Sequence, residues 1–195
     1  DLTLMGEHNK NILNNVNLHI KRGEIVGIAG VSGNGQSELI RCITGLEKVD
    51  TGNVIINNKD ITNNTVRDIR EAGIAHVPED RYMWGSAPDA TLAENALMGY
   101  EDSDEFSKKG ILNTDKVINH AINLISKFRV KADSYSQKIK ELSGGNAQKL
   151  IIAREMSKET PLIIACEPTR GIDIGAIEFI HDQLVEKRNN GDSVL

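Results

Sequence analysis

Short hydrophobic runs alternate along the chain with stretches in which the apolar residues recur at helical spacing. LTLM at 2–5 and NVNLHI at 15–20 lie on either side of a polar turn and predict two short strands. GEIVGIAG at 23–30 is rich in Ile and Val and bounded by glycines, which predicts a buried strand. QSELIRCITGL at 36–46 repeats its apolar residues at helical spacing, so we expect a helix directly after that strand.

The rest of the chain continues this alternation. Further strands are predicted in GNVIINNKDI (52–61), IAHV (74–77) and PLIIACEP (161–168). Further helices are predicted in TVRDIREAG (65–73), DKVINHAINLISKF (115–128), NAQKLIIAREMSK (146–158) and GAIEFIHDQLVEKRNNG (175–191). The helix at 115–128 should bury one broad face, formed by Val117, Ile118, Ala121, Ile122, Leu124, Ile125 and Phe128.

The order of these elements predicts an α/β fold. Strands alternating with helices indicate a parallel core sheet, to which the first strands add an antiparallel β part. Between Thr91 and about Lys158 we expect helices and loops but no strand, and YEDSDEFSKKG (100–110) should be a solvated loop. We therefore interpret residues 1–195 as one domain, with a helical subdomain of about 80–158 inserted into the α/β core.

Composition narrows the class of protein. The 195 residues are 39% hydrophobic and 26% charged, as in a soluble globular domain, and no apolar run approaches the length needed to span a bilayer. The net charge of −5 argues against a protein that coats nucleic acid. Two cysteines stand far apart without metal-ligand spacing, which predicts reduced thiols. The closing SVL is typical of a core strand cut short, so we expect a piece of a longer chain.

The segment GVSGNGQSEL, at 30–39, has the glycines of a phosphate-binding loop between a predicted strand and a predicted helix. Gly30, Gly33 and Gly35 permit backbone torsions that turn N–H groups inward, and the helix adds its positive end. Such a nest binds an anion without a side-chain charge. Gln36 stands at the position of the usual lysine, and Ser37 stands where a hydroxyl would bind Mg²⁺. The alternative is a tight strand-to-helix turn without a ligand.

Two further segments carry candidate chemistry. LSGGNAQK (142–149) places Ser-Gly-Gly at the start of a helix, with Ser143 as cap and donor; a capped helix after a glycine turn is the alternative. LIIACEPTRGID (162–173) delivers Glu167 at the end of a buried strand, where a carboxylate could orient or deprotonate a water. A surface glutamate before a proline turn is the alternative there.

In this order, the three segments closely resemble the ATP-binding domains of ABC transporters, which are P-loop NTPases, over nearly the whole chain. GVSGNGQS stands at the Walker A position, LSGGN at the signature and LIIACEP at Walker B. TRGID occupies the D-loop position and ends on Asp173, and HVPED occupies the Q-loop position with Glu79. VPEDR, TLAEN, FSKKGILN and PTRGIDIGAIEFIH resemble the second ATPase domain of tandem importer subunits for ribose- and galactose-type sugars or nucleosides, and we favour nucleosides.

The resemblance implies site residues and cofactors. ATP or ADP with Mg²⁺ would contact Gly30, Ser32, Gly33, Asn34, Gly35, Gln36, Ser37 and Glu38, with Ser37 on the metal. The signature residues would complete the ATP site of the sister domain: Ser143, Gly144, Gly145 and Asn146. Glu167 would be the candidate general base. His8 is a candidate for stacking on adenine, or else a solvated turn histidine.

The resemblance also implies partners and a location. They are a sister nucleotide-binding domain in the same full-length chain, membrane permease subunits that contact the helical subdomain and, indirectly, a solute-binding protein, at the cytoplasmic side of the inner membrane. No nucleic acid is expected. Met83 and Trp84 either contribute to the permease contact or pack under the subdomain. The family's switch histidine would follow Leu195.

Two departures from the family's motifs weaken the expected activity. Gln36 replaces the Walker A lysine, and Cys166 replaces the aspartate that holds Mg²⁺ through its shell. We therefore expect nucleotide binding to weaken and hydrolysis to suffer more, so that ATPase activity of this domain alone is weak or lost. The alternatives are a nucleotide-free structural or regulatory dimerisation module and an ABC-type ATPase outside transport. LSGGN, and the lack of N-K-x-D, argue against a kinase or a GTPase.

Overall fold

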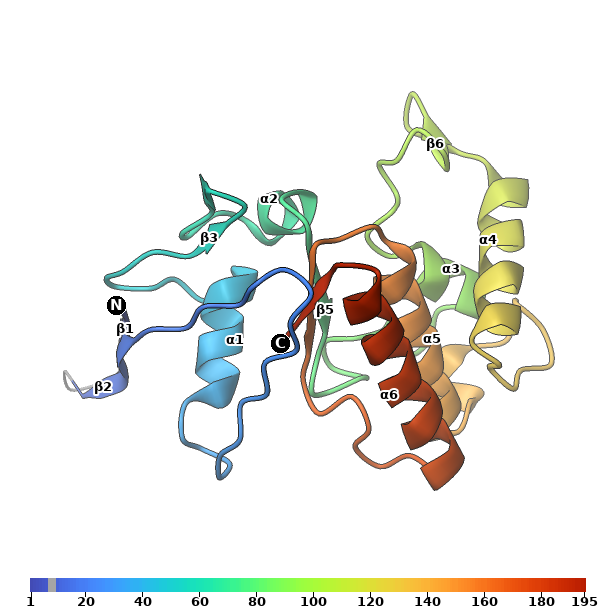
Figure 1. The fold of residues 1–195 in the computed structure, drawn as a ribbon. Helices are drawn as coiled ribbons and strands as arrows, with labels where there is room; N and C mark the ends of the chain where they lie inside the picture. The colour runs from blue at the N-terminus through green and yellow to red at the C-terminus, as the bar shows by residue number, and fades with distance from the viewer. Residues whose placement is uncertain (7–9) are drawn as a thin grey trace. The chain divides into compact units, whose positions relative to one another are not determined.

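A computed structural model describes residues 1–6 and 10–195 of the chain, which form two compact units (Figure 1). Unit 1 comprises Asp1–His76, Glu159–Ile164 and Lys187–Leu195, and unit 2 comprises Val77–Lys158 and Ala165–Glu186. The candidate stacking residue His8 lies outside the described residues. The fold is that of a mixed α/β protein with a parallel pairing in its core sheet.

Unit 1 contains most of the strands. Its elements are β1 (Leu2–Met5), β2 (Asn11–Val16), α1 (Gln36–Thr44), β3 (Ile55–Ile56), β4 (Lys59–Asp60), α2 (Val66–Glu71), β5 (Ile74–Val77), β8 (Leu162–Ala165) and β9 (Ser193–Val194), of which β5 and β8 each end one residue inside unit 2. The sheet order is β5-β8-β9, with β8 and β9 parallel. The predicted strands IAHV and PLIIACEP are therefore confirmed, as are the helices at 36–46 and 65–73.

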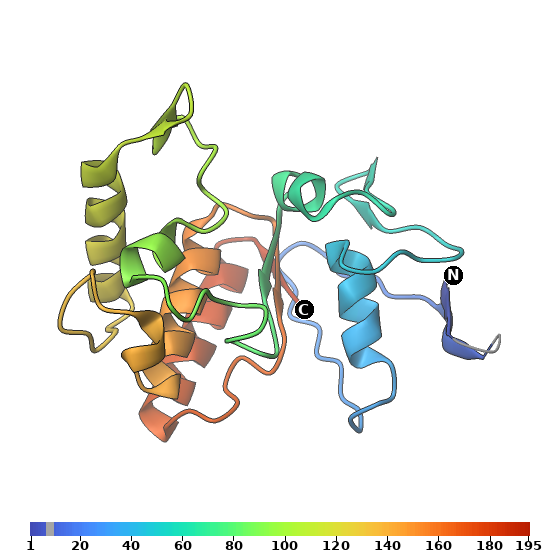
Figure 2. The ribbon, with the colours of Figure 1, turned by 180° about the vertical axis from the view of Figure 1, so that it is seen from behind.

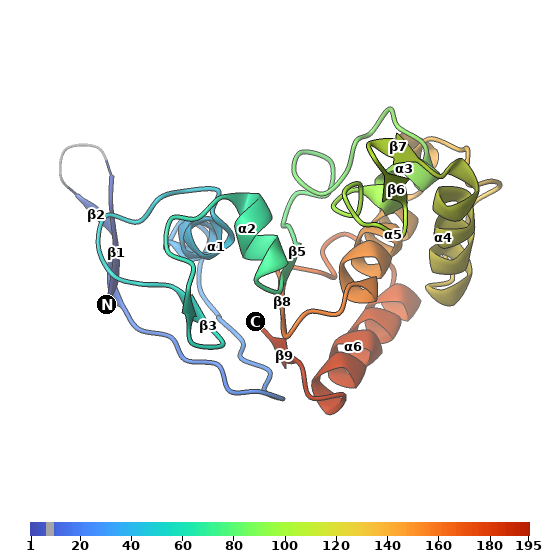
Figure 3. The ribbon, with the colours of Figure 1, turned by 90° about the horizontal axis from the view of Figure 1, so that it is seen from above.

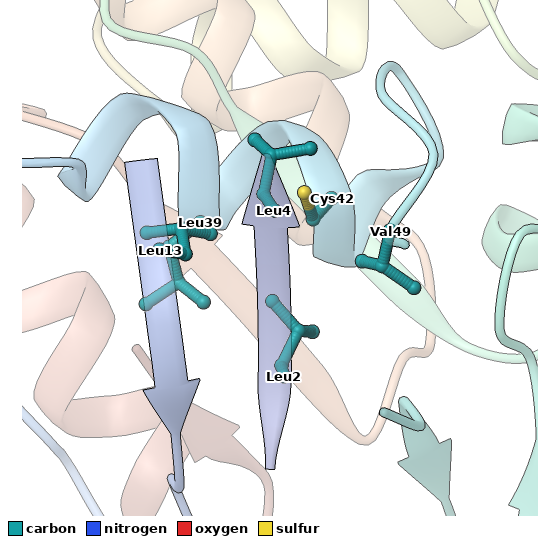
Figure 4. Packing of buried hydrophobic residues seen from close by; sticks show 6 residues of the cluster. All are labelled: Leu2, Leu4, Leu13, Leu39, Cys42 and Val49. Atoms are coloured by element: carbon teal, nitrogen blue, oxygen red, sulfur yellow. The ribbon is translucent and has the colours of Figure 1, made fainter. Parts of the chain in front are cut away.

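The N-terminal antiparallel part is a hairpin of β1 and β2, in which Leu4 pairs with Leu13. The strand LTLM is confirmed, whereas the predicted strand NVNLHI is wrong because β2 occupies residues 11–16. The earlier segment pairs because it directs Leu13 into the core, while Leu18 stays 41% exposed. Figure 4 shows leucines of both strands pointing toward the face of α1 that carries Leu39 and Cys42.

The predicted strand GEIVGIAG is mostly wrong. Ile25 forms an isolated bridge with Val194, and Val26 N donates to Val194 O at 2.9 Å. Among the described residues no ladder continues to Gly30, and Ile28 remains 44% exposed. The pairing that the structure describes for this segment runs from Glu24 to Val26, all of it with Val194.

The predicted strand GNVIINNKDI is instead a tight hairpin of β3 and β4. Asn57 and Asn58 both adopt a left-handed conformation, with φ of 48° and 63°. Two successive residues with positive φ form the turn that reverses a two-residue hairpin, and asparagine tolerates that conformation better than most residues.

Unit 2 is largely helical (Figures 2 and 3). Its elements are α3 (Leu92–Leu97), β6 (Ser107–Lys108), β7 (Ile111–Leu112), α4 (Thr114–Lys127), the 3-10 helix η2 (Ile139–Glu141), α5 (Gly144–Ser157) and α6 (Ile174–Asn189), whose last residues belong to unit 1. Helices α3, α4 and α5 pack against one another. The helices predicted at 115–128, 146–158 and 175–191 are confirmed.

Two details of unit 2 differ from the expectations. The residues predicted to lack a strand contain a hairpin of two two-residue strands, β6 and β7, whose first strand lies in the segment expected as a solvated loop. The apolar face of α4 is narrower than predicted: Val117, Ala121, Leu124 and the capping residue Phe128 are buried, whereas Ile122 is 44% exposed. Of the helices in the described part of the chain, none combines the length and apolarity that crossing a membrane requires.

Candidate functional site

The glycine loop leads directly into α1 in unit 1. Gly33 and Gly35 have φ of 88° and 95°, a conformation that favours glycine because it has no Cβ. Gly35 is the N-cap of α1, so the first N–H groups of the helix begin at this loop. A Cβ at Gly35 would lie 2.9 Å from Leu13 Cδ2, so the hairpin core also excludes a larger residue there. The local geometry is that of a backbone anion nest at a helix N-terminus.

The side chain of Gln36 folds back over the first glycine of the loop. A Cβ added at Gly30 would coincide with Gln36 Nε2, so the carboxamide lies directly against that backbone. Residues 30–37 contain no Lys or Arg. The nearby Glu38 pairs with Arg41 within α1, at 2.8 Å between Oε1 and Nη2. The loop itself thus offers main-chain N–H groups, hydroxyls and neutral amides.

The end of β8, in unit 2, carries Cys166 and Glu167. Burial raises the pKa of the Cys166 thiol to about 11, and the nearby carboxylates of Glu79 and Glu167 add to the shift. The thiol is therefore protonated at neutral pH and supplies no negative charge where the family's motif has an aspartate. Glu167 has a φ of 42°, an uncommon conformation for a residue with a Cβ and one that stores local strain at this turn.

Arg170 brings the two glutamates of this region together. Its Nη1 lies 3.2 Å from Glu167 Oε2 and 3.0 Å from Glu79 Oε1. All three side chains are well exposed, so each pair contributes little to stability. These ion pairs instead fix the position of the candidate general base Glu167, whose carboxylate is paired with Arg170 in this structure.

The signature segment lies at the start of α5. Ser143 is the N-cap, with an extended backbone, but among the described residues its side chain accepts no hydrogen bond from a main-chain N–H of the first turn of α5. Its Oγ accepts from Asn146 Nδ2 at 2.9 Å, and Asn146 Oδ1 accepts from Lys131 N at 2.9 Å. The prediction that Ser143 is the cap residue is therefore confirmed in its position, but the side-chain capping bond is not made, because the hydroxyl accepts from Asn146 instead.

Two further residues surround the same helix start. Arg81 Nη1 donates to Gly144 O at 2.7 Å, and its Nη2 donates to Arg170 O at 2.6 Å. Asp173 caps α6: its Oδ1 accepts from Ala176 N at 2.9 Å. Arg81 and Arg170 lie within VPEDR and TRGID, but the sequence does not indicate these roles, since the partners of both residues are distant in sequence.

Within unit 2 the structure therefore brings together residues from four predicted segments. They are the Q-loop position, the signature, the end of Walker B and the D-loop position, represented by Glu79, Ser143–Asn146, Glu167 and Asp173. The glycine loop belongs to unit 1 and is described separately. Met83 and Trp84, beside Glu79, are 70% and 55% exposed, which argues against the alternative that they pack under the subdomain.

Mg²⁺ prefers oxygen ligands, and the residues present fit such an ion only in part. In unit 1, Ser37 offers a hydroxyl at the start of α1. In unit 2, Cys166 offers a protonated thiol at the end of β8 and not a carboxylate. Neither place by itself supplies the oxygen ligands of a magnesium site, so most of the metal's ligands would have to come from nucleotide phosphates and water.

Comparison with known proteins places these motifs in context. The family profile described as "ABC transporter" matches residues 13–170. The chain is 46% identical over 180 residues to the nucleoside import ATP-binding protein NupA of Lactococcus lactis, covering 92% of this chain and 36% of the relative. It is also 46% identical over 180 residues to the guanosine import ATP-binding protein NupO of Bacillus subtilis, covering 92% and 35%. The chain thus spans about a third of the length of the curated relatives it matches.

A solved structure shares the fold over almost the entire chain. It is an ATP-binding cassette in a dimeric post-hydrolysis state bound to ADP and Pi, with a TM-score of 0.80 and 28% sequence identity. The match covers 99% of this chain and 83% of that chain.

Proposed function

Because the chain belongs to the ABC transporter family, we propose that it is the second ATP-binding domain of an importer subunit that powers nucleoside uptake. One contrast within the chain carries this proposal. The signature segment is intact and held by side-chain contacts, whereas the phosphate loop has Gln36 in place of the usual lysine. The identity is 46% to nucleoside and guanosine import proteins and 43% to a glucose import protein, a small margin in favour of nucleosides as the transported class.

We propose that the glycine loop holds the phosphates of ATP or ADP weakly. Main-chain N–H groups at the start of α1 supply the contacts, together with Ser32, Asn34 and Ser37. Gln36 offers a neutral amide in place of an ammonium group. A hydrogen bond from a charged group contributes about 1.5–3 kcal/mol against about 0.5–1.5 for a neutral one, so the loss weakens triphosphate binding about tenfold.

Hydrolysis at this loop should be slow. A bound Mg²⁺ would neutralise charge on the transferred phosphoryl group, but Cys166 supplies no anion to hold it. Glu167 is paired with Arg170 at 3.2 Å and would have to leave that pair to accept a proton from water. The pocket of this domain is therefore regulatory or structural rather than a site of rapid turnover.

The signature of this domain should serve the sister domain's ATP. Ser143 and the N-terminus of α5 present a hydroxyl and main-chain N–H groups to an anion, with Gly144 and Gly145 allowing close approach. The partners are then the sister domain in the same chain and the permease subunits, at the cytoplasmic face of the membrane. Exposed Met83 and Trp84 are candidates for the permease contact.

Two substitutions in the full-length subunit test this division of labour. Ser143→Arg should reduce steady-state ATPase activity at least about a hundredfold, because a bulky cation blocks the sister site. Gln36→Ala should change it less than about threefold, because a neutral contact at a weak site is lost. Ser126→Arg, at an exposed serine of α4, is the matched control for added bulk and charge.

The opposite ranking, with Gln36→Ala abolishing activity and Ser143→Arg leaving it intact, would refute the proposal. A second candidate function, a nucleotide-free scaffold, is favoured by the neutral loop and the protonated Cys166. Titration with ATP and ADP, with and without Mg²⁺, separates the two: no measurable binding at this loop favours the scaffold.

A further inference from the structure

We propose that Arg81 is a positioning residue that fixes the signature segment and the D-loop segment to each other, so that both meet the sister domain's nucleotide as one rigid surface. The inference rests on the proposed function, in which the signature serves the sister's ATP site. Arg81 lies two residues after Glu79 at the Q-loop position.

The first observation is the geometry of the guanidinium group. Nη1 donates to Gly144 O at 2.7 Å, and Nη2 donates to Arg170 O at 2.6 Å. The two acceptors are main-chain carbonyls at the start of α5 and in the turn before α6. Because guanidinium is planar, these two short bonds hold the segments at a fixed separation, which the single ammonium group of lysine cannot reproduce.

The second observation is that neighbouring glycines leave room for this side chain. A Cβ at Gly144 would lie 2.9 Å from Arg81 Nη1, and a Cβ at Gly171 would lie 3.2 Å from Nη2. Gly171 also has a φ of 66°, which favours glycine. Glycine in the signature therefore has a second role here, since it makes space for the arginine as well as for a ligand.

The third observation is a contact that joins the same two segments on the other side. A Cβ at Gly145 would lie 3.3 Å from Asp173 Oδ2 and 3.7 Å from Ile172 Cβ. Asp173 is itself fixed as the cap of α6. The start of α5 is thus enclosed by Arg81 and by the D-loop residues, while Ser143 remains exposed for a ligand.

The residues next to Arg81 and its acceptors are themselves held by further contacts. Arg170, whose carbonyl accepts from Arg81, pairs through its guanidinium with Glu79 and Glu167. Asp80, next to Arg81, accepts from Tyr82 N and Met83 N and so fixes the start of the turn from which Arg81 extends. Arg81 thereby links the candidate permease-contact residues to the signature through one side chain.

The test uses the full-length subunit and compares Arg81→Lys and Arg81→Gln with the wild type. A misplaced surface at the sister site should lower kcat for ATP about tenfold, with KM changed less than about twofold, since binding by the sister's own loop is untouched. Arg67→Lys, in an exposed pair with Glu71 on α2, is the matched control and should leave kcat unchanged.

Hydrogen exchange of the same variants provides a readout besides activity. Amides in 143–147 and in 170–174 should both exchange about threefold faster or more, while those of α4 (Thr114–Lys127) remain as in the wild type. Faster exchange in only one of the two segments, or wild-type kcat with wild-type exchange, overturns the proposal.

The remaining outcomes are also decisive. If exchange rises throughout unit 2 and the melting temperature falls, Arg81 stabilises the fold as a whole and its positioning role is refuted. If Ser143→Arg leaves ATPase activity intact, the proposed function fails whatever the Arg81 variants do. If Ser143→Arg abolishes activity but both Arg81 variants turn over normally, only the positioning role fails.

Discussion

The glycine loop of unit 1 and the signature segment of unit 2 both place glycines at a helix N-terminus, but they are held differently. The loop before α1 is shaped by positive φ at Gly33 and Gly35 and covered by the neutral amide of Gln36. The start of α5 is fixed by Arg81 and Asp173 from distant segments and by Asn146 of its own first turn. The two helix starts therefore differ in side-chain support as well as in backbone conformation, which is left-handed at Gly35 and extended at Ser143.

This difference indicates which of the two regions needs a precisely fixed geometry. A weak phosphate site needs main-chain N–H groups in the right conformation, which glycines supply without charged side chains. A surface that completes another domain's active site must keep its shape while that domain moves, and hydrogen bonds to distant segments provide that rigidity. At the start of α5, the charged side chains of Arg81 and Asp173 provide this rigidity.

The largest expected effect concerns Cys166, whose protonated thiol underlies the argument that this end of β8 carries no metal-binding anion. Its pKa is raised from 9.0 to about 11, first by burial and then by Glu79 and Glu167. The thiolate fraction at pH 8 should therefore be about a hundredfold below that of an ordinary cysteine, and alkylation by iodoacetamide correspondingly slower. The folded state gains stability from this shift below pH 9 and loses it as the pH rises to about 11.

Mass spectrometry of the Cys166 peptide after alkylation between pH 8 and pH 11 measures this shift. Ser126→Cys, exposed on α4, provides the reference thiol. Poor access alone would slow the reaction equally at every pH, whereas a raised pKa moves the midpoint of the rate profile to about 11. A midpoint near 9 would mean that an anion forms readily there, and the contrast between the two regions would weaken.

The next effect concerns the glycines of the loop. Gly33→Ala should weaken nucleotide binding roughly tenfold, because a non-glycine residue in the left-handed conformation costs about 1–2 kcal/mol. Gly35→Ala should weaken it about thirtyfold, because its Cβ also meets Leu13 Cδ2 at 2.9 Å. Counting the described residues, a Cβ at Gly33 has no neighbour within 4 Å, so Gly33→Ala is the control for backbone strain alone.

Photolabelling with an azido-adenine nucleotide and peptide mapping reports on this loop separately from the sister site. Equal loss in the two variants would show that the hairpin core does not constrain the loop. No loss in either would show that its left-handed glycines are not what binds the phosphates.

Local signals in the sequence predicted much of the fold. Helix α2 was predictable because Thr65 and Asp68 form a capping box and Gly73 follows at a φ of 106°. The strand over 23–30 was not, because an apolar run does not show which neighbour it pairs with, and here Val194 pairs with the part around Ile25. The face of α4 was predicted too wide, since periodicity marks which residues are apolar but not how many of them a partner covers.

The candidate site was predictable where a motif is contiguous and not where it depends on distant backbone. The glycine loop, Ser143, Glu167 and Asp173 each lie in a continuous stretch of recognisable residues. Arg81 donates to carbonyls of residues 63 and 89 positions away, and a carbonyl acceptor leaves no trace in the sequence. Asn146 was expected to face a nucleotide, but its bond to Ser143 Oγ depends on the rotamer of the folded helix.

The smallest expected effect is the most direct test of the contrast between the two regions, because it adds the missing charge to the weaker one. Gln36→Lys places an ammonium group over Gly30, where Gln36 Nε2 now lies, and should tighten ATP binding about tenfold, and ADP binding less. Gln36→Met, which has similar length but no donor, should weaken binding slightly. Because the gain is electrostatic, it should shrink as the salt concentration rises, whereas a gain from packing would not.

If Gln36→Lys leaves ATP affinity unchanged while Gly35→Ala abolishes it, phosphate binding depends on the backbone alone. The loop would then not be a weakened form of a charged site, because it would bind phosphate without any contribution from a positive side chain.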